Sequence, residues 1–180
     1  MDIDLLLSRV PSYQRFLTVD ELFDHARSVS QAHPEMARYE VVGTSTRGDA
    51  IPMLTIGNGP RHVMVFACPH PNEPVGAMLV SFLSEELIVN EALREGRTWH
   101  LLPCVDPDGT RLNEGWFKGP FNIRNYARHY YRPRPQDQVE WTFPIEYKTF
   151  VWNDPTPETR ALMNAIQIAK PDVMYSLHNA

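Results

Sequence analysis

The hydrophobic pattern changes from helical spacing to strand-like runs early in the chain. Within residues 22–29, apolar side chains recur at i, i+3 and i+4, with acidic residues ahead of them. This spacing is typical of an amphipathic helix and predicts surface helices within residues 3–33. Two strand-like runs follow, at residues 39–45 and 51–56, and the turn residues at 47–49 between them predict an antiparallel hairpin.

A strand, a helix and a second strand come next in the pattern. Residues 62–68 form a continuous apolar run, which is typical of a strand buried on both faces. Residues 73–93 carry an apolar helical stripe, and Pro74 suits the first turn of that helix. A second buried run lies at residues 99–105. This order predicts parallel strands joined by a right-handed crossover, and therefore the α/β class.

The pattern weakens between residues 106 and 156. Residues 106–109 read as a turn, and the rest of the stretch is rich in glycine, proline and aromatic residues. We interpret it as a long loop that covers the core, with the wall of a binding site as the alternative. Regularity returns with a predicted helix from Pro157 to residue 168 and a strand at residues 172–177.

Length and charge narrow the class of protein. A chain of 180 residues predicts one domain, residues 1–180. Its net charge of −5 gives no reason to expect nucleic acid or a membrane as a partner. No apolar stretch approaches the roughly 20 residues that cross a bilayer. The first residues lack the features of a secretory signal, which favours the cytoplasm. Cys68 and Cys104 lie in apolar runs and are expected to be reduced core residues.

Three residues are candidate metal ligands. His70 and Glu73 lie where a buried strand gives way to a helix, and His178 follows the last predicted strand. Ligands in α/β sheets collect at the carboxyl ends of strands, and two histidines with one carboxylate are typical of catalytic zinc. The alternatives are a capped turn histidine at 70, an acid favoured by the helix dipole at 73, and a surface histidine at 178. The other histidines, in predicted helices, strands and the loop, are expected to be non-ligands: His25, His33, His62, His100 and His129.

Four motifs in one order carry a resemblance to a known family. They are His70-Pro71-Asn72-Glu73, Asp106-Pro107-Asp108-Gly109, Pro157-Glu158-Thr159 and Ser176-Leu177-His178. In these motifs the chain resembles the zinc metallocarboxypeptidases of the carboxypeptidase A type. The resemblance spans about residues 60–180. It implies a mixed, largely parallel α/β sheet flanked by helices, with one zinc ion held by His70, Glu73 and His178.

The family's activity, and the positions where this chain departs from the family's pattern, set further expectations. The family hydrolyses C-terminal peptide bonds, with zinc and an arginine polarising the scissile carbonyl and a glutamate activating the water. Asp106 stands where the family usually has Asn. The family's Asn-Arg pair, which binds the substrate's terminal carboxylate, aligns with residues 139–144, where the arginine is absent. Arg111 is the candidate for the carbonyl-polarising arginine, and Arg124 and Arg128 are candidates for substrate binding.

The resemblance also implies catalytic parts that lie beyond this sequence. The family places its catalytic glutamate after the third ligand, and we expect Glu114 not to replace it. The sequence reads as the zinc-binding half of the domain, truncated after His178, which would expose a sheet edge and favour self-association.

The sequence therefore predicts zinc-dependent hydrolysis of a peptide or amide bond, with a peptide or an acyl-amino acid as substrate. The alternatives are a zinc deacylase or amidase that acts on a small N-acyl substrate, and a non-catalytic metal-binding domain. His and carboxylate ligands accept several divalent metals, so zinc is itself an expectation from the resemblance.

Overall fold

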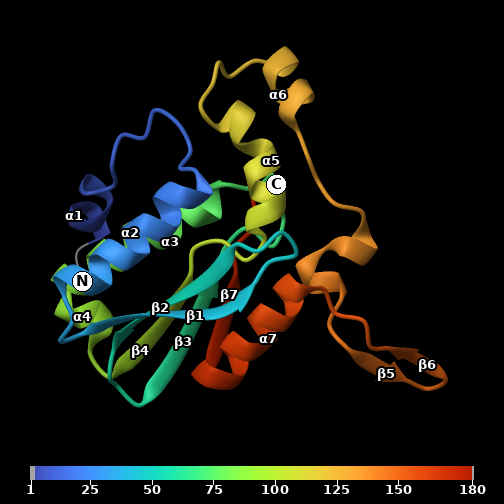
Figure 1. Cartoon of the computed structure of the whole chain (residues 1–180). Coiled ribbons are helices and arrows are strands. Elements are labelled where there is room, and N and C mark those ends of the chain that lie inside the picture. The colour runs from blue at the N-terminus through green and yellow to red at the C-terminus, as the bar shows by residue number, and fades with distance from the viewer. Residues whose placement is uncertain (1–2, 180) are drawn as a thin grey trace.

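A five-stranded sheet with helices on both faces forms the body of the computed structural model, which describes residues 3–179 (Figure 1). The strands of this sheet are β1 (Ala37–Thr44), β2 (Ala50–Gly57), β3 (Arg61–Phe66), β4 (Arg97–Leu102) and β7 (Val173–Ser176). The helices are α1 (Ile3–Ser8), α2 (Val19–Ala32), α3 (Val75–Val89), α4 (Glu91–Arg94), α5 (Pro107–Phe117), α6 (Ile123–His129) and α7 (Pro157–Ala169).

The sheet is mixed, with strand order β1-β2-β4-β3-β7. The predicted hairpin is confirmed, because β1 pairs antiparallel with β2. The predicted crossover is also confirmed, since β3 runs parallel to β4 and α3 lies between them in the chain. β7 pairs parallel with the other side of β3, whereas β2 and β4 are antiparallel. The α/β class with a mixed sheet is therefore correct, and the parallel part is the half formed by β4, β3 and β7.

Alternation along the strands divides the core into two layers. In β3, Met64 and Phe66 face the layer that contains α7, whereas Val65 faces the layer formed with α2 and α3. Leu101 and Leu102 of β4 divide in the same way. Figure 1 shows α2 and α3 on one side of the sheet and α7 on the other. Burying a side chain such as Phe66, which is 2% exposed, contributes roughly 1.5–3 kcal/mol.

The region from 106 to 156 corrects the sequence interpretation. The predicted turn at residues 106–109 is the start of α5: Asp106 is the N-cap, its Oδ1 accepts a hydrogen bond from Gly109 N at 2.8 Å, and Pro107 occupies the first turn. Asp, Pro and Gly are also turn residues, so their presence did not distinguish the two structures. The predicted loop also contains α6, two 3-10 turns (Pro135–Asp137 and Val139–Trp141) and a hairpin formed by β5 (Ile145–Tyr147) and β6 (Phe150–Trp152), which projects from the molecule in Figure 1.

Both cysteines are buried and unpaired, as the sequence predicted. Among the residues that the structure describes, no helix combines the length and the apolar character needed to cross a membrane.

Candidate metal centre

The three predicted ligands come from the ends of two adjacent parallel strands. His70 lies shortly after β3, and His178 lies two residues after the end of β7. Because β3 and β7 pair in parallel, their carboxyl ends meet at the same edge of the sheet. Glu73 lies just before α3, and its backbone N–H donates to the carbonyl of His70 at 3.1 Å, which closes a turn between them.

The backbone bends sharply between β3 and this turn. Cys68 has a φ of 54°, in the left-handed region that costs a residue other than glycine roughly 1–2 kcal/mol. The bend directs the chain away from the strand direction immediately before Pro69 and His70. Strain of this kind is common where a fold must aim a functional side chain.

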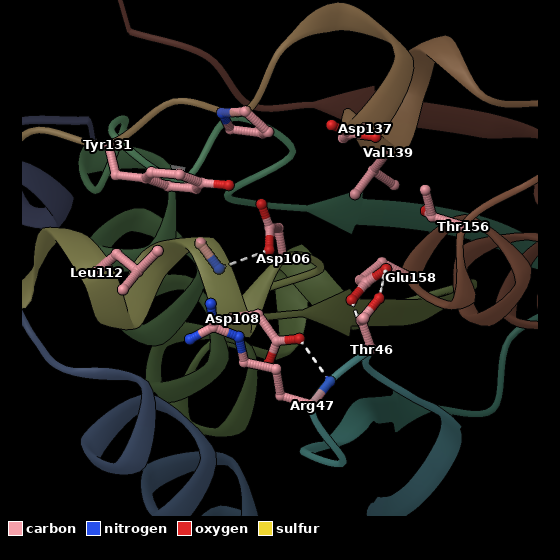
Figure 2. A pocket seen from close by; sticks show the side chains of 12 residues that line it. Thr46, Arg47, Asp106, Asp108, Leu112, Tyr131, Asp137, Val139, Thr156 and Glu158 are labelled. Carbon is pink, nitrogen blue, oxygen red and sulfur yellow. Dashed lines mark hydrogen bonds between the residues drawn. The ribbon is translucent and has the colours of Figure 1, made fainter.

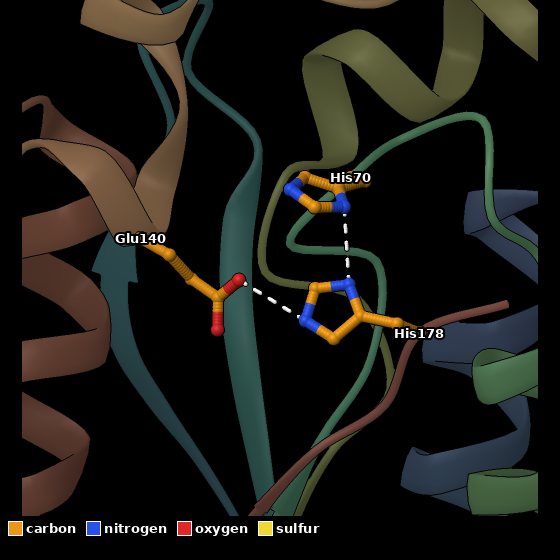
Figure 3. A group of neighbouring side chains, drawn as sticks. All are labelled: His70, Glu140 and His178. Atoms are coloured by element: carbon orange, nitrogen blue, oxygen red, sulfur yellow. Dashed lines mark hydrogen bonds and ion pairs between the residues drawn. The ribbon is translucent and has the colours of Figure 1, made fainter. Parts of the chain in front are cut away.

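The side chains of His70, Glu73 and His178 converge. His70 Nδ1 lies 3.0 Å from Glu73 Oε1, and His178 Nδ1 lies 3.0 Å from Glu73 Oε2. The two Nδ1 atoms also lie 3.0 Å from each other, and Figure 3 shows the two rings meeting through these atoms. The structure thus brings together all three residues that the sequence indicated.

This arrangement fits a metal ion. Two ligand nitrogens on a tetrahedral zinc ion lie about 3.3 Å apart, given zinc–nitrogen distances of about 2.0–2.1 Å. A hydrogen bond between the two Nδ1 atoms requires a proton on one of them, whereas a cation among the two lone pairs and the Glu73 carboxylate would satisfy all three groups. Imidazole nitrogen and carboxylate oxygen are a common zinc donor set.

Burial and mutual contacts shift the pKa values of this group. Burial lowers the pKa of His70, an effect that the Glu73 carboxylate partly opposes. Burial by itself would raise the pKa of Glu73, but His70, His178 and the backbone of Asn179 outweigh it, so the pKa is lowered. Neutral imidazole and ionised carboxylate are the forms that bind metals.

Two further residues contact the predicted ligands, and sequence reasoning did not identify either as part of the site. Arg132 Nη1 lies 3.0 Å from Glu73 Oε1. Glu140, in the 3-10 turn Val139–Trp141, has Oε2 at 3.1 Å from His178 Nε2. One potential ligand atom from each of His70, Glu140 and His178 lies within 4.8 Å of the others. Neither Arg132 nor Glu140 lies in a motif of the resemblance, and their contacts depend on how the 106–156 region folds over the sheet.

The predicted catalytic and substrate-binding arginines lie in other environments. Arg111, in α5, binds Asp49 through Nε and Asp20 through Nη2, each at 2.7 Å. Hydrogen bonds to Asp49 and Asp20 raise the pKa of Arg111. Arg124 and Arg128 are exposed on α6, and no hydrogen bond or ion pair within residues 3–179 joins them to the predicted ligands. Their proposed roles stay predictions.

Glu114 has a structural contact. Its Oε1 accepts a hydrogen bond from the backbone N–H of Val19 at 2.9 Å, at the start of α2. An acid at this position stabilises the orphan amides of a helix N-terminus. This contact agrees with the expectation that Glu114 is not a catalytic base.

A cavity of about 260 Å³ lies against residues 131–140, the segment that also carries Arg132 and Glu140 (Figure 2). Tyr131 and Val139 line this cavity, whereas Arg132 and Glu140 contact the predicted ligands. Asp106 also lines it, and burial raises the pKa of this carboxyl to about 7.

Two other carboxylates of the cavity are already engaged with the β1–β2 turn. Asp108 Oδ2 accepts from the backbone of Arg47 at 2.8 Å, and Glu158 Oε1 accepts from that of Thr46 at 2.7 Å. Both are buried. These two carboxylates therefore tie α5 and α7 to the turn.

Comparison with known proteins places the chain in a family. The sequence model of a family described as zinc carboxypeptidase matches residues 23–180. The chain belongs to the zinc carboxypeptidase family. His70, Glu73 and His178 all lie within the matched residues.

Several solved structures share the fold of this chain. Carboxypeptidase A from Helicoverpa armigera is 15% identical with a TM-score of 0.74, over 98% of this chain and 51% of that one. Bovine thrombin-activatable fibrinolysis inhibitor, solved in complex with tick carboxypeptidase inhibitor, is 14% identical with a TM-score of 0.65, over 94% of this chain and 62% of that one. A metallo-carboxypeptidase from Burkholderia cenocepacia is 20% identical with a TM-score of 0.64, over 91% of this chain and 41% of that one.

The sequence also matches an uncharacterized protein of Zymomonas mobilis, with 31% identity over 77 residues. That match covers 40% of this chain and 20% of the Zymomonas protein. The chain spans about half the length of the Helicoverpa carboxypeptidase.

Proposed function

We propose that this chain supplies the metal-binding part of a zinc-dependent hydrolase that cleaves a peptide or amide bond. The observation that carries the proposal is the convergence of His70 Nδ1, His178 Nδ1 and the Glu73 carboxylate, with 3.0 Å between each pair of groups. Membership of the zinc carboxypeptidase family supports both the metal and the class of reaction.

His70, Glu73 and His178 would hold the zinc ion. Three protein ligands leave a fourth position open, which is the arrangement of catalytic zinc sites. When bound, zinc polarises a substrate carbonyl and makes a water more acidic. The protein residues contribute a fixed donor geometry, because His70 and Glu73 are closed into one turn and His178 follows the neighbouring strand.

Arg132 suits the role of the arginine that polarises the scissile carbonyl better than Arg111, which the sequence indicated for it. Arg132 contacts Glu73 directly, and its side chain is 31% exposed, so it can also face a bound substrate. A guanidinium beside the metal would stabilise negative charge that develops on a carbonyl oxygen. Arg111, by contrast, is engaged with two aspartates.

We assign no general base within residues 3–179. Glu114 accepts a hydrogen bond from the first backbone amide of α2, and Glu140 lies beside Nε2 of His178, across the ring from the convergent Nδ1 atoms. A complete reaction would need a further carboxylate at the metal centre. For this reason a non-catalytic metal-binding role remains the alternative from another functional class.

One observation favours an N-acyl substrate over a peptide with a free C-terminus. Within residues 139–144, where the family's carboxylate-binding Asn-Arg pair aligns, there is no arginine, and Trp141 is 68% exposed. A tryptophan cannot form the bidentate contact that a guanidinium makes with a carboxylate. A deacylase or amidase activity on a small N-acyl compound is therefore the second candidate function.

Metal content tests the proposal. The untagged chain should contain about one zinc per molecule by elemental analysis after exposure to zinc, and His178→Ala should lose it because one of three ligands is removed. His129→Ala is the matched control, since His129 Nδ1 donates within α6 to the carbonyl oxygen of Asn125, at 3.0 Å. Equal zinc in all three proteins, or none in the unmodified chain, would overturn the assignment.

A further inference from the structure

We infer that Glu140 is a positioning residue for His178: its carboxylate holds the Nε2–H of this ring and so presents Nδ1 as the lone pair that binds the metal. The inference rests on the proposed zinc site. It concerns a residue whose role came neither from the sequence motifs nor from the family resemblance.

Hydrogen-bond accounting around His178 supports this role. Ser176 Oγ donates its single hydrogen to Glu140 Oε1, at 2.6 Å. Ser176 Oγ also lies 2.9 Å from His178 Nε2. Because its hydrogen is already donated to Glu140, Ser176 Oγ can offer that nitrogen only a lone pair. Glu140 Oε2, at 3.1 Å, is a second acceptor for the same nitrogen. Both partners of Nε2 are therefore acceptors, which requires that Nε2 carries the proton.

The other nitrogen of the ring is then free for a metal. A neutral imidazole with its proton on Nε2 has a lone pair on Nδ1. In this structure Nδ1 is the atom that faces Glu73 and His70. A carboxylate that fixes the tautomer and the ring orientation of a ligating histidine raises the basicity of the ligand.

The backbone that carries Glu140 is anchored in the core. Val139 is 1% exposed, and its carbonyl accepts from Thr159 Oγ1 of α7 at 2.8 Å. On the other side of the turn, Thr142 Oγ1 lies 2.6 Å from the same hydroxyl. A side chain on an anchored backbone loses less freedom when it binds its partner, so Glu140 is preorganised to hold His178.

Direct metal binding by Glu140 is the competing role. One of its carboxylate oxygens lies within 4.8 Å of a ring nitrogen of His70 and of one of His178. Glu140, however, contacts Nε2, whereas His70 and Glu73 contact Nδ1 on the other side of the ring, and Figure 3 shows this separation. One ion cannot lie in both places.

The test compares zinc affinity in four proteins: the unmodified chain, Glu140→Ala, Glu140→Gln and Glu146→Ala. Glu146 is an exposed carboxylate of β5 and serves as the matched control. Competition with a chromophoric chelator should show a roughly 10–100-fold weaker affinity for Glu140→Ala, still with one zinc at saturation. Glu140→Gln should lose less, because its amide oxygen still accepts the Nε2 hydrogen. Glu146→Ala should match the unmodified chain.

A spectroscopic measurement separates positioning from a general effect on the fold. In the zinc-loaded chain, NMR should show a downfield, slowly exchanging ring N–H of His178. This signal should disappear or move upfield in Glu140→Ala, move upfield by less in Glu140→Gln because a neutral amide is a weaker acceptor than a carboxylate, and stay unchanged in Glu146→Ala. If Glu140→Ala does not fold by circular dichroism, Glu140→Gln carries the same comparison.

Three results would overturn the inference: unchanged affinity in the folded Glu140 variants, loss of the stoichiometric zinc at saturation, or a His178 ring signal insensitive to Glu140. The first and third would remove the positioning role, and the second would make Glu140 a ligand. Failure of the unmodified chain to bind zinc would instead refute the proposed function, so the two failures are distinguishable.

Discussion

The histidines of this chain lie in contrasting surroundings. His70 and His178 meet at a carboxylate at the end of two strands. His100, in β4, is 3% exposed and lies between two polar partners: Thr55 Oγ1 is 3.2 Å from its Nδ1, and His62 Nδ1 is 3.0 Å from its Nε2. Burial, assisted by repulsion from His62, lowers the pKa of His100 to about 4.

The depressed pKa of His100 predicts a loss of stability at mildly acidic pH. The unfolded chain takes up this proton near pH 6.5, whereas the folded chain resists until about 4. Its contribution to stability is therefore complete above 6.5 and is lost as the pH falls toward 4, by at most about 1.4 kcal/mol per pH unit. We expect His100→Gln, which cannot titrate, to lose less stability across this window. Urea unfolding at a series of pH values measures this difference, and parallel pH profiles for the two proteins would contradict the prediction.

At the scale of single residues, motif residues were predictable and supporting residues were not. His70 and Glu73 lie close in sequence, so their shared location follows from a strand-to-helix corner. Arg132 and Glu140 belong to a region without clear periodicity, and nothing in their neighbours marks them as partners of Glu73 and His178. Their contacts arise from chain packing over long sequence separations.

Among the elements, α7 packs unusually closely on β1. Gly43 lies beside a β-bulge in β1, and a Cβ added there would overlap with Cβ and Cα of Ala161 in α7. Ala161 belongs to the core layer that contains α7 and is 2% exposed. This contact needs glycine because of the close approach of a helix, and the backbone there has no positive φ.

Overpacking at this contact should separate α7 from the sheet. We expect Gly43→Ala to reduce the free energy of unfolding by about 1–3 kcal/mol. Ala161→Gly should cost about 1 kcal/mol through helix propensity alone. The double variant should be more stable than the sum of the two effects predicts, because the overlap is relieved. Denaturant unfolding of the unmodified chain, the two single variants and the double variant completes this cycle. Strictly additive effects would show that overlap between residues 43 and 161 does not cause the loss of stability in Gly43→Ala.

The start of α5 shows why one element was misassigned. An Asp N-cap followed by Pro and Gly has the composition of a turn, and only the backbone after Gly109 reveals a helix. Elsewhere, long periodic segments were assigned correctly as helices, as for α3 and α7. In α3 the buried face differs from the apolar spacing, because Val75 and Leu79 are 50% and 47% exposed whereas Ser81 and Ser84 are buried.

Considered as a whole, the molecule has one sheet edge at β1 and the other at β7. Three apolar residues of β7 are substantially exposed: Val173 at 45%, Met174 at 49% and Tyr175 at 53%. An exposed apolar edge strand with free backbone groups is a template for pairing with another chain.

We expect the 180-residue chain to self-associate through β7. Sedimentation velocity should show a species larger than the monomer whose fraction rises with concentration. Met174→Lys should shift the distribution toward monomer, because a charge on an edge strand opposes pairing. Val41→Lys is the matched control on the opposite edge strand, at a position that is 54% exposed. A chain that is monomeric at every concentration, or equal behaviour of the two variants, would refute this edge as the cause.

The amino-acid sequence alone determined the α/β class, the βαβ unit, the reduced core cysteines and the identity of three convergent residues, because periodicity and strand ends are local properties. The tertiary structure decided which nitrogen of each histidine faces Glu73, which arginine reaches the site and which carboxylate holds His178. These three contacts depend on how residues 106–156 pack across the carboxyl ends of β3 and β7. Long-range packing of an aperiodic segment leaves no repeating pattern in its sequence, so the sequence alone could not predict them.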